Sequence, residues 1–132
     1  MTSRPNILLI LTDQQRLSTL SCYGKTPCIT PNLQKLREDG VLFENAYTTC
    51  PLCSPARATV MTGLYPGKHG VTSNITDVGC SIHELPDCDF MLSRRLLDQG
   101  YSCGYSGKWH LGTDKKKIFA YDNPCNSLPI DL

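Results

Sequence analysis

Cys53 is the residue whose surroundings offer the most chemistry, because it stands in the run Cys-Ser-Pro-Ala-Arg at the start of a short predicted helix. Ser54 is a good N-cap, Pro55 suits the first helical position, and Gly63 suits the position after the helix. Free N–H groups and the positive end of the helix dipole favour an anion beside Cys53. Arg57, one turn into the helix, adds a fork of donors suited to a tetrahedral oxyanion. The sequence therefore predicts a thiol beside an anion-binding site.

This run, followed by Thr62 and Gly63, resembles the signature of type I sulfatases, C-x-P-x-R with a trailing T-G. Residues 100–110 resemble the second signature of that family, with Cys103 where serine or threonine is usual. The resemblance extends over residues 6–112. It implies an α/β fold of the alkaline phosphatase and sulfatase type, with a largely parallel sheet flanked by helices. It also implies hydrolysis of a sulfuric ester, either a small molecule or a saccharide sulfate.

The resemblance further implies which residues act on the ester. In sulfatases the signature cysteine, here Cys53, is converted to formylglycine by a formylglycine-generating enzyme. Lys108 and His110 match the family's sulfate-binding lysine and histidine, and Arg57 is the arginine of the Cys53 signature. Taken alone, Lys108 and His110 would be a solvated lysine and a loop histidine. Their occurrence together with the Cys53 motif, in the expected order, favours catalytic roles for all four residues.

Asp13 follows the apolar run of residues 6–12, which predicts a strand covered on both faces. Taken alone, Asp13 is equally compatible with a cap on the next turn. In sulfatases, acids at this place bind a divalent cation, usually calcium, so the resemblance implies Asp13, Gln14 and Cys53 as metal ligands. Gln14 departs from the common second aspartate. Its amide oxygen can coordinate a hard cation, but the site loses one negative charge.

The mechanism that the resemblance implies has a physical rationale. One hydroxyl of the hydrated aldehyde attacks sulfur and the alcohol leaves. The other hydroxyl then expels sulfate and regenerates the aldehyde, so the second step is intramolecular. A cation on Asp13 and Gln14 would acidify the attacking hydroxyl. Arg57 and Lys108 would hold the negative charge, and His110 would bind sulfate or assist the leaving oxygen.

The elements that must position these residues can be read from local signals. Thr30 and Pro31 predict the start of a helix that Gly40 stops, and residues 90–99 predict an amphipathic helix between Asp89 and Gly100. Besides the run at 6–12, residues 41–47 and 101–106 predict strands. Because ligand sites in open α/β sheets lie at the carboxyl ends of strands, we expect Asp13 and Lys108 at one edge near Cys53.

Composition excludes several classes of partner. The chain has 132 residues, of which 40% are hydrophobic, and a net charge of +1, so bulk charge indicates neither nucleic acid nor a membrane surface. The eight cysteines are fewer than a disulfide scaffold of this length would carry. The apolar run after Met1 is too short for a signal sequence or a membrane span. These features predict reduced thiols and a cytoplasmic location.

Family members are several times longer, so residues 1–132 are expected to be the N-terminal part of a catalytic domain, inactive alone.

Three alternatives for the function remain open. Within the superfamily, a phosphonate or phosphate ester hydrolase would use the same formylglycine and accept Gln14. Outside it, Cys50 and Cys53 form a C-x-x-C pair typical of redox proteins. A zinc-binding module is a third alternative, although no second ligand pair completes a four-ligand site.

Overall fold

The computed structural model describes residues 4–113, which divide into two units that meet between Ala46 and Tyr47. The lysine run at 115–117, which predicts a solvated face, lies outside the described residues. No helix within residues 4–113 combines the length and the apolar character that crossing a membrane requires.

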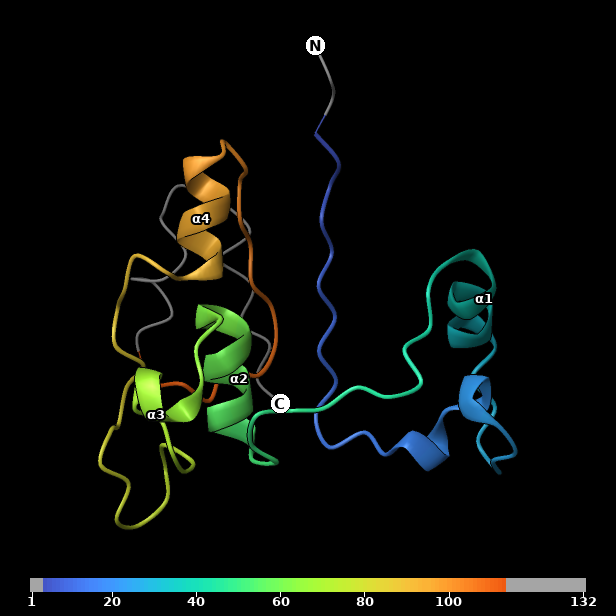
Figure 1. The fold of residues 1–132 in the computed structure, drawn as a ribbon, viewed down its shortest axis with the longest axis horizontal. Helices are drawn as coiled ribbons and strands as arrows, with labels where there is room; N and C mark the ends of the chain where they lie inside the picture. Colours follow the sequence, from blue (N-terminus) through green and yellow to red (C-terminus); the bar gives the residue numbers. More distant parts are fainter. Residues whose placement is uncertain (1–3, 114–132) are drawn as a thin grey trace. The chain divides into compact units, whose positions relative to one another are not determined.

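The first unit contains two short 3-10 helices, η1 (Leu17–Thr19) and η2 (Ser21–Tyr23), and the α-helix α1 (Pro31–Asp39) (Figure 1). The predicted helix is confirmed, with Thr30 as the N-cap, Pro31 in the first position and Gly40 at the end. The Thr30 hydroxyl does not cap α1. It instead accepts a hydrogen bond from the Ser21 amide at 3.0 Å, which ties the start of α1 to η2.

The second unit contains α2 (Cys53–Thr62), α3 (Pro66–His69) and α4 (Leu92–Asp98), and α2 contacts both of the others (Figure 1). One hydrophobic cluster holds this unit together. Its members come from α2, from the loop between α3 and α4, and from the segment after α4. The buried side chains are those of Ala58, Met61, Val71, Ile75, Leu85, Met91, Trp109 and Leu111. The helix that carries Cys53 therefore forms part of the hydrophobic core of this unit.

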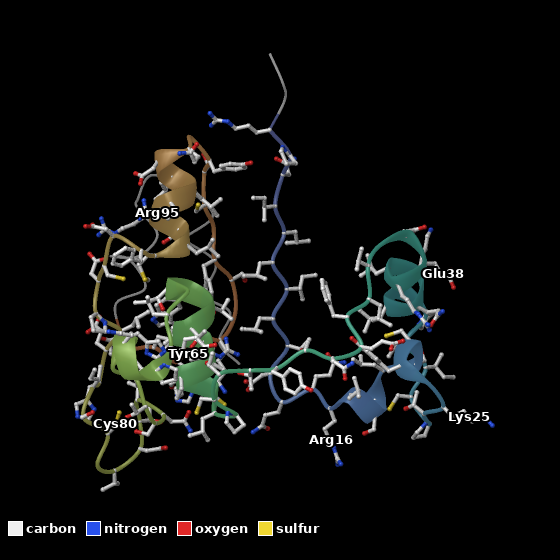
Figure 2. All side chains as sticks on the ribbon, viewed as in Figure 1. Arg16, Lys25, Glu38, Tyr65, Cys80 and Arg95 are labelled. Carbon is white, nitrogen blue, oxygen red and sulfur yellow. The ribbon has the colours of Figure 1, made fainter. Side chains whose placement is uncertain are left out.

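No strand forms among residues 4–113, so the strands predicted at 6–12, 41–47 and 101–106 are not observed in the described part of the chain, and the predicted sheet is not confirmed. A strand exists only through hydrogen bonds to a neighbour, and these segments find none within their units. Residues 6–12 run as extended chain, and the side chains from Ile7 to Leu11 are 46–84% exposed. Figure 2 shows side chains standing out to both sides of this segment.

The predicted helix boundaries in the second unit also need correction. Helix α2 begins at Cys53 with Leu52 as its N-cap, so Ser54 is inside the first turn and is not the cap. Helix α4 begins at Leu92 rather than at residue 90, with Met91 in place of Asp89 as the N-cap. The short helix α3 lies in a segment for which the sequence predicted no element.

Candidate active site

Cys53 is the first residue of α2, and its thiol is half-buried and free of any disulfide. The next residues turn inward, since Ser54 and Pro55 are buried and Arg57 is only 6% exposed. Cys50 is also a free thiol. The Cys53 thiol therefore lies at the N-terminal end of α2, and the rest of the first turn is packed into the protein.

Ser54 is a hydrogen-bonding hub at this helix start. Its backbone N–H donates to the Asn74 side-chain oxygen at 3.1 Å, and its hydroxyl donates to the His110 carbonyl at 2.7 Å. The same hydroxyl accepts a hydrogen bond from the Ile75 amide at 3.2 Å. Because Ser54 N–H is already bonded and Pro55 has no N–H, the first turn has fewer free amides for an anion than the sequence predicted.

Arg57 joins α2 to the segment that carries Lys108. One guanidinium nitrogen, Nη1, donates to the Lys108 carbonyl at 2.7 Å, and the Tyr105 hydroxyl donates to the same carbonyl. Tyr105 in turn packs edge-on against Trp109, with ring centroids 5.3 Å apart. Burial raises the pKa of Tyr105, and this shift is opposed by the charge of Arg57 and by a hydrogen bond with it. Arg57 therefore fixes the backbone of the Lys108 segment, while the Lys108 side chain is exposed.

His110 is held in an uncommon backbone conformation beside α2. Its φ is 53°, in the left-handed region, and the neighbours Trp109 and Leu111 are 3% and 0% exposed. Its Nε2 lies 3.2 Å from the Thr76 hydroxyl oxygen. Its Nδ1 is buried and has no hydrogen-bond partner within the described residues. Non-glycine residues in this region cost free energy and cluster at functional sites.

The second unit thus brings together four residues that the sequence predicted for the catalytic site, namely Cys53, Arg57, Lys108 and His110. Asp13 and Gln14 belong to the first unit, where both are exposed and Gln14 has a φ of 54°. Within residues 4–113, no three His, Cys, Asp or Glu side chains gather to hold a metal ion. One carboxylate and one amide are too few oxygens for calcium, which takes six to eight. The described residues alone therefore do not fit a complete cation site.

The sequence did not predict that His69, in the second unit, is buried. His69 is 6% exposed, and its Nδ1 accepts a hydrogen bond from the Val71 amide at 3.1 Å. Its Nε2 lies 3.3 Å from the Thr59 hydroxyl, which lies 2.8 Å from the Thr49 hydroxyl. Burial lowers the pKa of His69, against smaller opposing effects of backbone hydrogen bonds. A single histidine in a Gly-containing segment gives no local signal of burial, so the sequence could not have singled it out.

Comparisons with known proteins give a family match. The family model "Sulfatase" matches residues 5–130. Similar curated proteins include steryl-sulfatase from Homo sapiens, 39% identical over an alignment of 114 residues that covers 83% of this chain and 20% of that protein. They also include the uncharacterized sulfatase YidJ from Escherichia coli strain K12, 38% identical over 82% of this chain and 20% of that protein. Arylsulfatase A from Bos taurus is 38% identical over 89% of this chain and 23% of that protein.

The matched region is a small part of these relatives, because this chain spans about a fifth of their length. No solved structure matches the chain significantly. The family match nevertheless covers most of the 132 residues and includes both predicted motifs. The chain belongs to the sulfatase family.

Proposed function

We propose that this chain carries the nucleophile-bearing part of the active site of a sulfuric ester hydrolase, with Cys53 converted to formylglycine. The observation that supports it is the placement of Cys53 at the start of α2, with the His110 carbonyl bonded to the next residue. Family membership implies an alkaline phosphatase-like α/β fold and sulfatase chemistry in general terms. A largely parallel sheet flanked by helices, as in that fold, is part of this proposal.

In this proposal formylglycine supplies a hydrated aldehyde as the nucleophile at sulfur. The residues of the chain bind and orient the ester around it. The exposed ammonium of Lys108 attracts the sulfate group, and Arg57 holds the Lys108 backbone in place through its carbonyl. His110, fixed at its carbonyl, binds sulfate or gives a proton to the leaving oxygen.

A complete site needs further residues. Asp13 and Gln14 are the proposed ligands of a divalent cation. Both offer oxygen, which matches calcium, but they supply only a small part of its coordination shell. We therefore expect hydrolysis to require regions of a sulfatase beyond the fifth that this chain matches. The 132-residue chain by itself should be inactive.

The decisive experiment follows the fate of Cys53. The chain is produced with and without a formylglycine-generating enzyme, and the peptide containing Cys53 is analysed by mass spectrometry. With the enzyme, it should exchange its sulfur for oxygen and lose two hydrogens. Cys53→Ala should remove this change, whereas Cys50→Ala, outside the C-x-P-x-R frame, should keep it. A Cys53 that stays entirely a thiol in an active full-length sulfatase carrying this segment would refute the proposal.

Activity is then tested on an aryl sulfate, using the 132-residue chain and a full-length sulfatase that carries it. We expect turnover only in the full-length protein, and only with Cys53 intact. Comparable turnover by the 132-residue chain would show that the matched fifth already contains a sufficient site.

A phosphonate or phosphate ester hydrolase is the second candidate, because Gln14 replaces the common second acidic ligand. An aryl sulfate, an aryl phosphonate and a phosphodiester compared on the same full-length protein would separate the two. We expect the sulfate to react fastest.

The seven cysteines among the described residues are all free thiols, which supports the proposal of a reducing, cytoplasmic environment.

A further inference from the structure

The backbone of His110 is held by Ser54. The Ser54 hydroxyl accepts a hydrogen bond from the Ile75 amide, so its own proton is directed to the His110 carbonyl, 2.7 Å away. Ser54 is fully buried, and water does not compete for these bonds. A histidine with a φ of 53° persists only where its surroundings hold it, and this hydroxyl is one such restraint.

The ring of His110 is held by Thr76. The Thr76 hydroxyl lies 3.2 Å from Nε2, whereas Nδ1 is buried without a partner among the described residues. A neutral imidazole carries its proton on one nitrogen only. With the proton on Nε2, the N–H donates to Thr76 and the buried Nδ1 is only an unpaired acceptor. With the proton on Nδ1, a buried N–H would be left unpaired, which is the rarer and costlier situation.

We propose that Ser54 and Thr76 are positioning residues for His110: Ser54 fixes its backbone next to Cys53, and Thr76 holds the ring at Nε2, while the buried, unpaired Nδ1 favours the tautomer with the proton on Nε2. The role of this arrangement in hydrolysis rests on the proposed function, but the tautomer itself does not.

Thr76 is the better residue to change. It is exposed, so removing its hydroxyl should leave the core intact, and its hydrogen bond should act on the ring rather than on folding. Thr76→Val removes the hydroxyl at nearly constant shape, and Thr76→Ser restores it. Thr72→Val is the matched control, because Thr72 is an exposed threonine in the same loop.

The tautomer is measured by ¹⁵N NMR of histidine side chains in the 132-residue chain at about pH 8.5, where imidazole is neutral. The sequence contains three histidines, and His110→Gln identifies the signals of His110. We expect Nε2 protonated and Nδ1 unprotonated in the wild type, in Thr76→Ser and in Thr72→Val. Thr76→Val removes the hydroxyl bonded to Nε2, so the His110 ring signals should shift or broaden, whereas they should stay unchanged in Thr76→Ser and Thr72→Val. His110 signals that are the same in Thr76→Val and the wild type would overturn the role of Thr76, and a wild type protonated mainly on Nδ1 would overturn the proposed tautomer.

Ser54→Ala tests the second restraint, with Ser93→Ala as a control in another buried serine. We expect the His110 signals to move or broaden in Ser54→Ala and to stay unchanged in Ser93→Ala. Unchanged signals in a folded Ser54→Ala would remove Ser54 from the proposal. If Ser54→Ala does not fold, the Thr76 variants decide the outcome.

Kinetics in a full-length sulfatase carrying this segment complete the test. Thr76→Val should lower kcat by about 10- to 100-fold with little change in KM, because misplacing a reacting group affects the transition state most. Thr76→Ser should restore kcat, and an unaltered kcat in Thr76→Val would contradict positioning. A wild type without turnover on any ester would refute the proposed function, while the NMR result would still decide the tautomer.

Discussion

Protonation of His69 should destabilise the second unit as the pH falls. The Val71 amide donates to Nδ1 of His69 at 3.1 Å, so this nitrogen carries no proton in the folded chain. Protonation converts Nδ1 from an acceptor into a donor and breaks this bond. Val71 is 0% exposed, and its N–H would then be buried without a partner. Leaving a buried backbone N–H without a partner lowers the free energy of unfolding by about 1–3 kcal/mol. The total free energy of unfolding of a typical domain is roughly 5–15 kcal/mol.

The direction of the pH dependence follows from the pKa of His69, which burial lowers from its ordinary value. The folded chain therefore binds fewer protons than the unfolded chain as the pH falls below about 6.5. The contribution of neutral His69 to the free energy of unfolding is fully present above that pH. It is lost as the pH falls through the lowered pKa.

The assay is urea unfolding followed by the fluorescence of Trp109, the single tryptophan, which is 3% exposed. The free energy of unfolding is compared at about pH 7.5 and about pH 5, on either side of the ordinary histidine pKa. His69→Asn keeps an acceptor two bonds from Cβ but does not titrate, so its pH dependence should be shallower than that of the wild type. His83→Asn changes an exposed histidine and should retain the wild-type dependence. Equal pH dependence in His69→Asn and the wild type would refute the reasoning.

Two further substitutions test the packing around the site by the same unfolding assay. Leu111→Ala removes a side chain that is 0% exposed and should cost about 2–5 kcal/mol, whereas Leu36→Ala, 63% exposed, should cost under about 0.5 kcal/mol; similar costs for both would contradict the assigned core. Gly112→Ala should cost at least about 1 kcal/mol, because φ is 118° and an added Cβ would lie 2.6 Å from Cγ of Glu84. Gly104→Ala places its Cβ in open space and should be nearly neutral. A larger loss of stability in Gly104→Ala than in Gly112→Ala would show that glycine is not required at position 112.

Local signals predicted some elements well. Helix α1 begins and ends where Pro31 and Gly40 place it, because a proline at the first position and a glycine at the end act within one turn. Gly63 ends α2 with a φ of 70°, as its position predicted. The start of α2 was misplaced because the Ser54 hydroxyl bonds to His110, 56 residues later, instead of capping its own helix. A hydrogen bond between residues so far apart in the chain cannot be predicted from the local sequence.

The same distinction applies to the site and to the sheet. The motifs around Cys53 and His110 were recognisable because their residue types and order are specific. Asn74 and Thr76, which bond to these motifs, are common polar residues in a loop, and their roles depend on tertiary placement. The predicted strands were not observed for a related reason, since an apolar run such as residues 6–12 predicts a covered strand but does not say which neighbour would pair with it or cover it.

The exposed run from Ile7 to Leu11 has a consequence for synthesis. Cys22 is the only buried side chain among residues 4–46, so this unit has almost nothing of its own to cover the run while it is being synthesised. Its uncharged, β-prone residues can pair with the same segment of another nascent chain. Arg4 and Asp13 flank it with charge and oppose that pairing, as gatekeeper residues do. Replacing either charge should therefore increase the demand for chaperones during translation before it changes any property of the finished site.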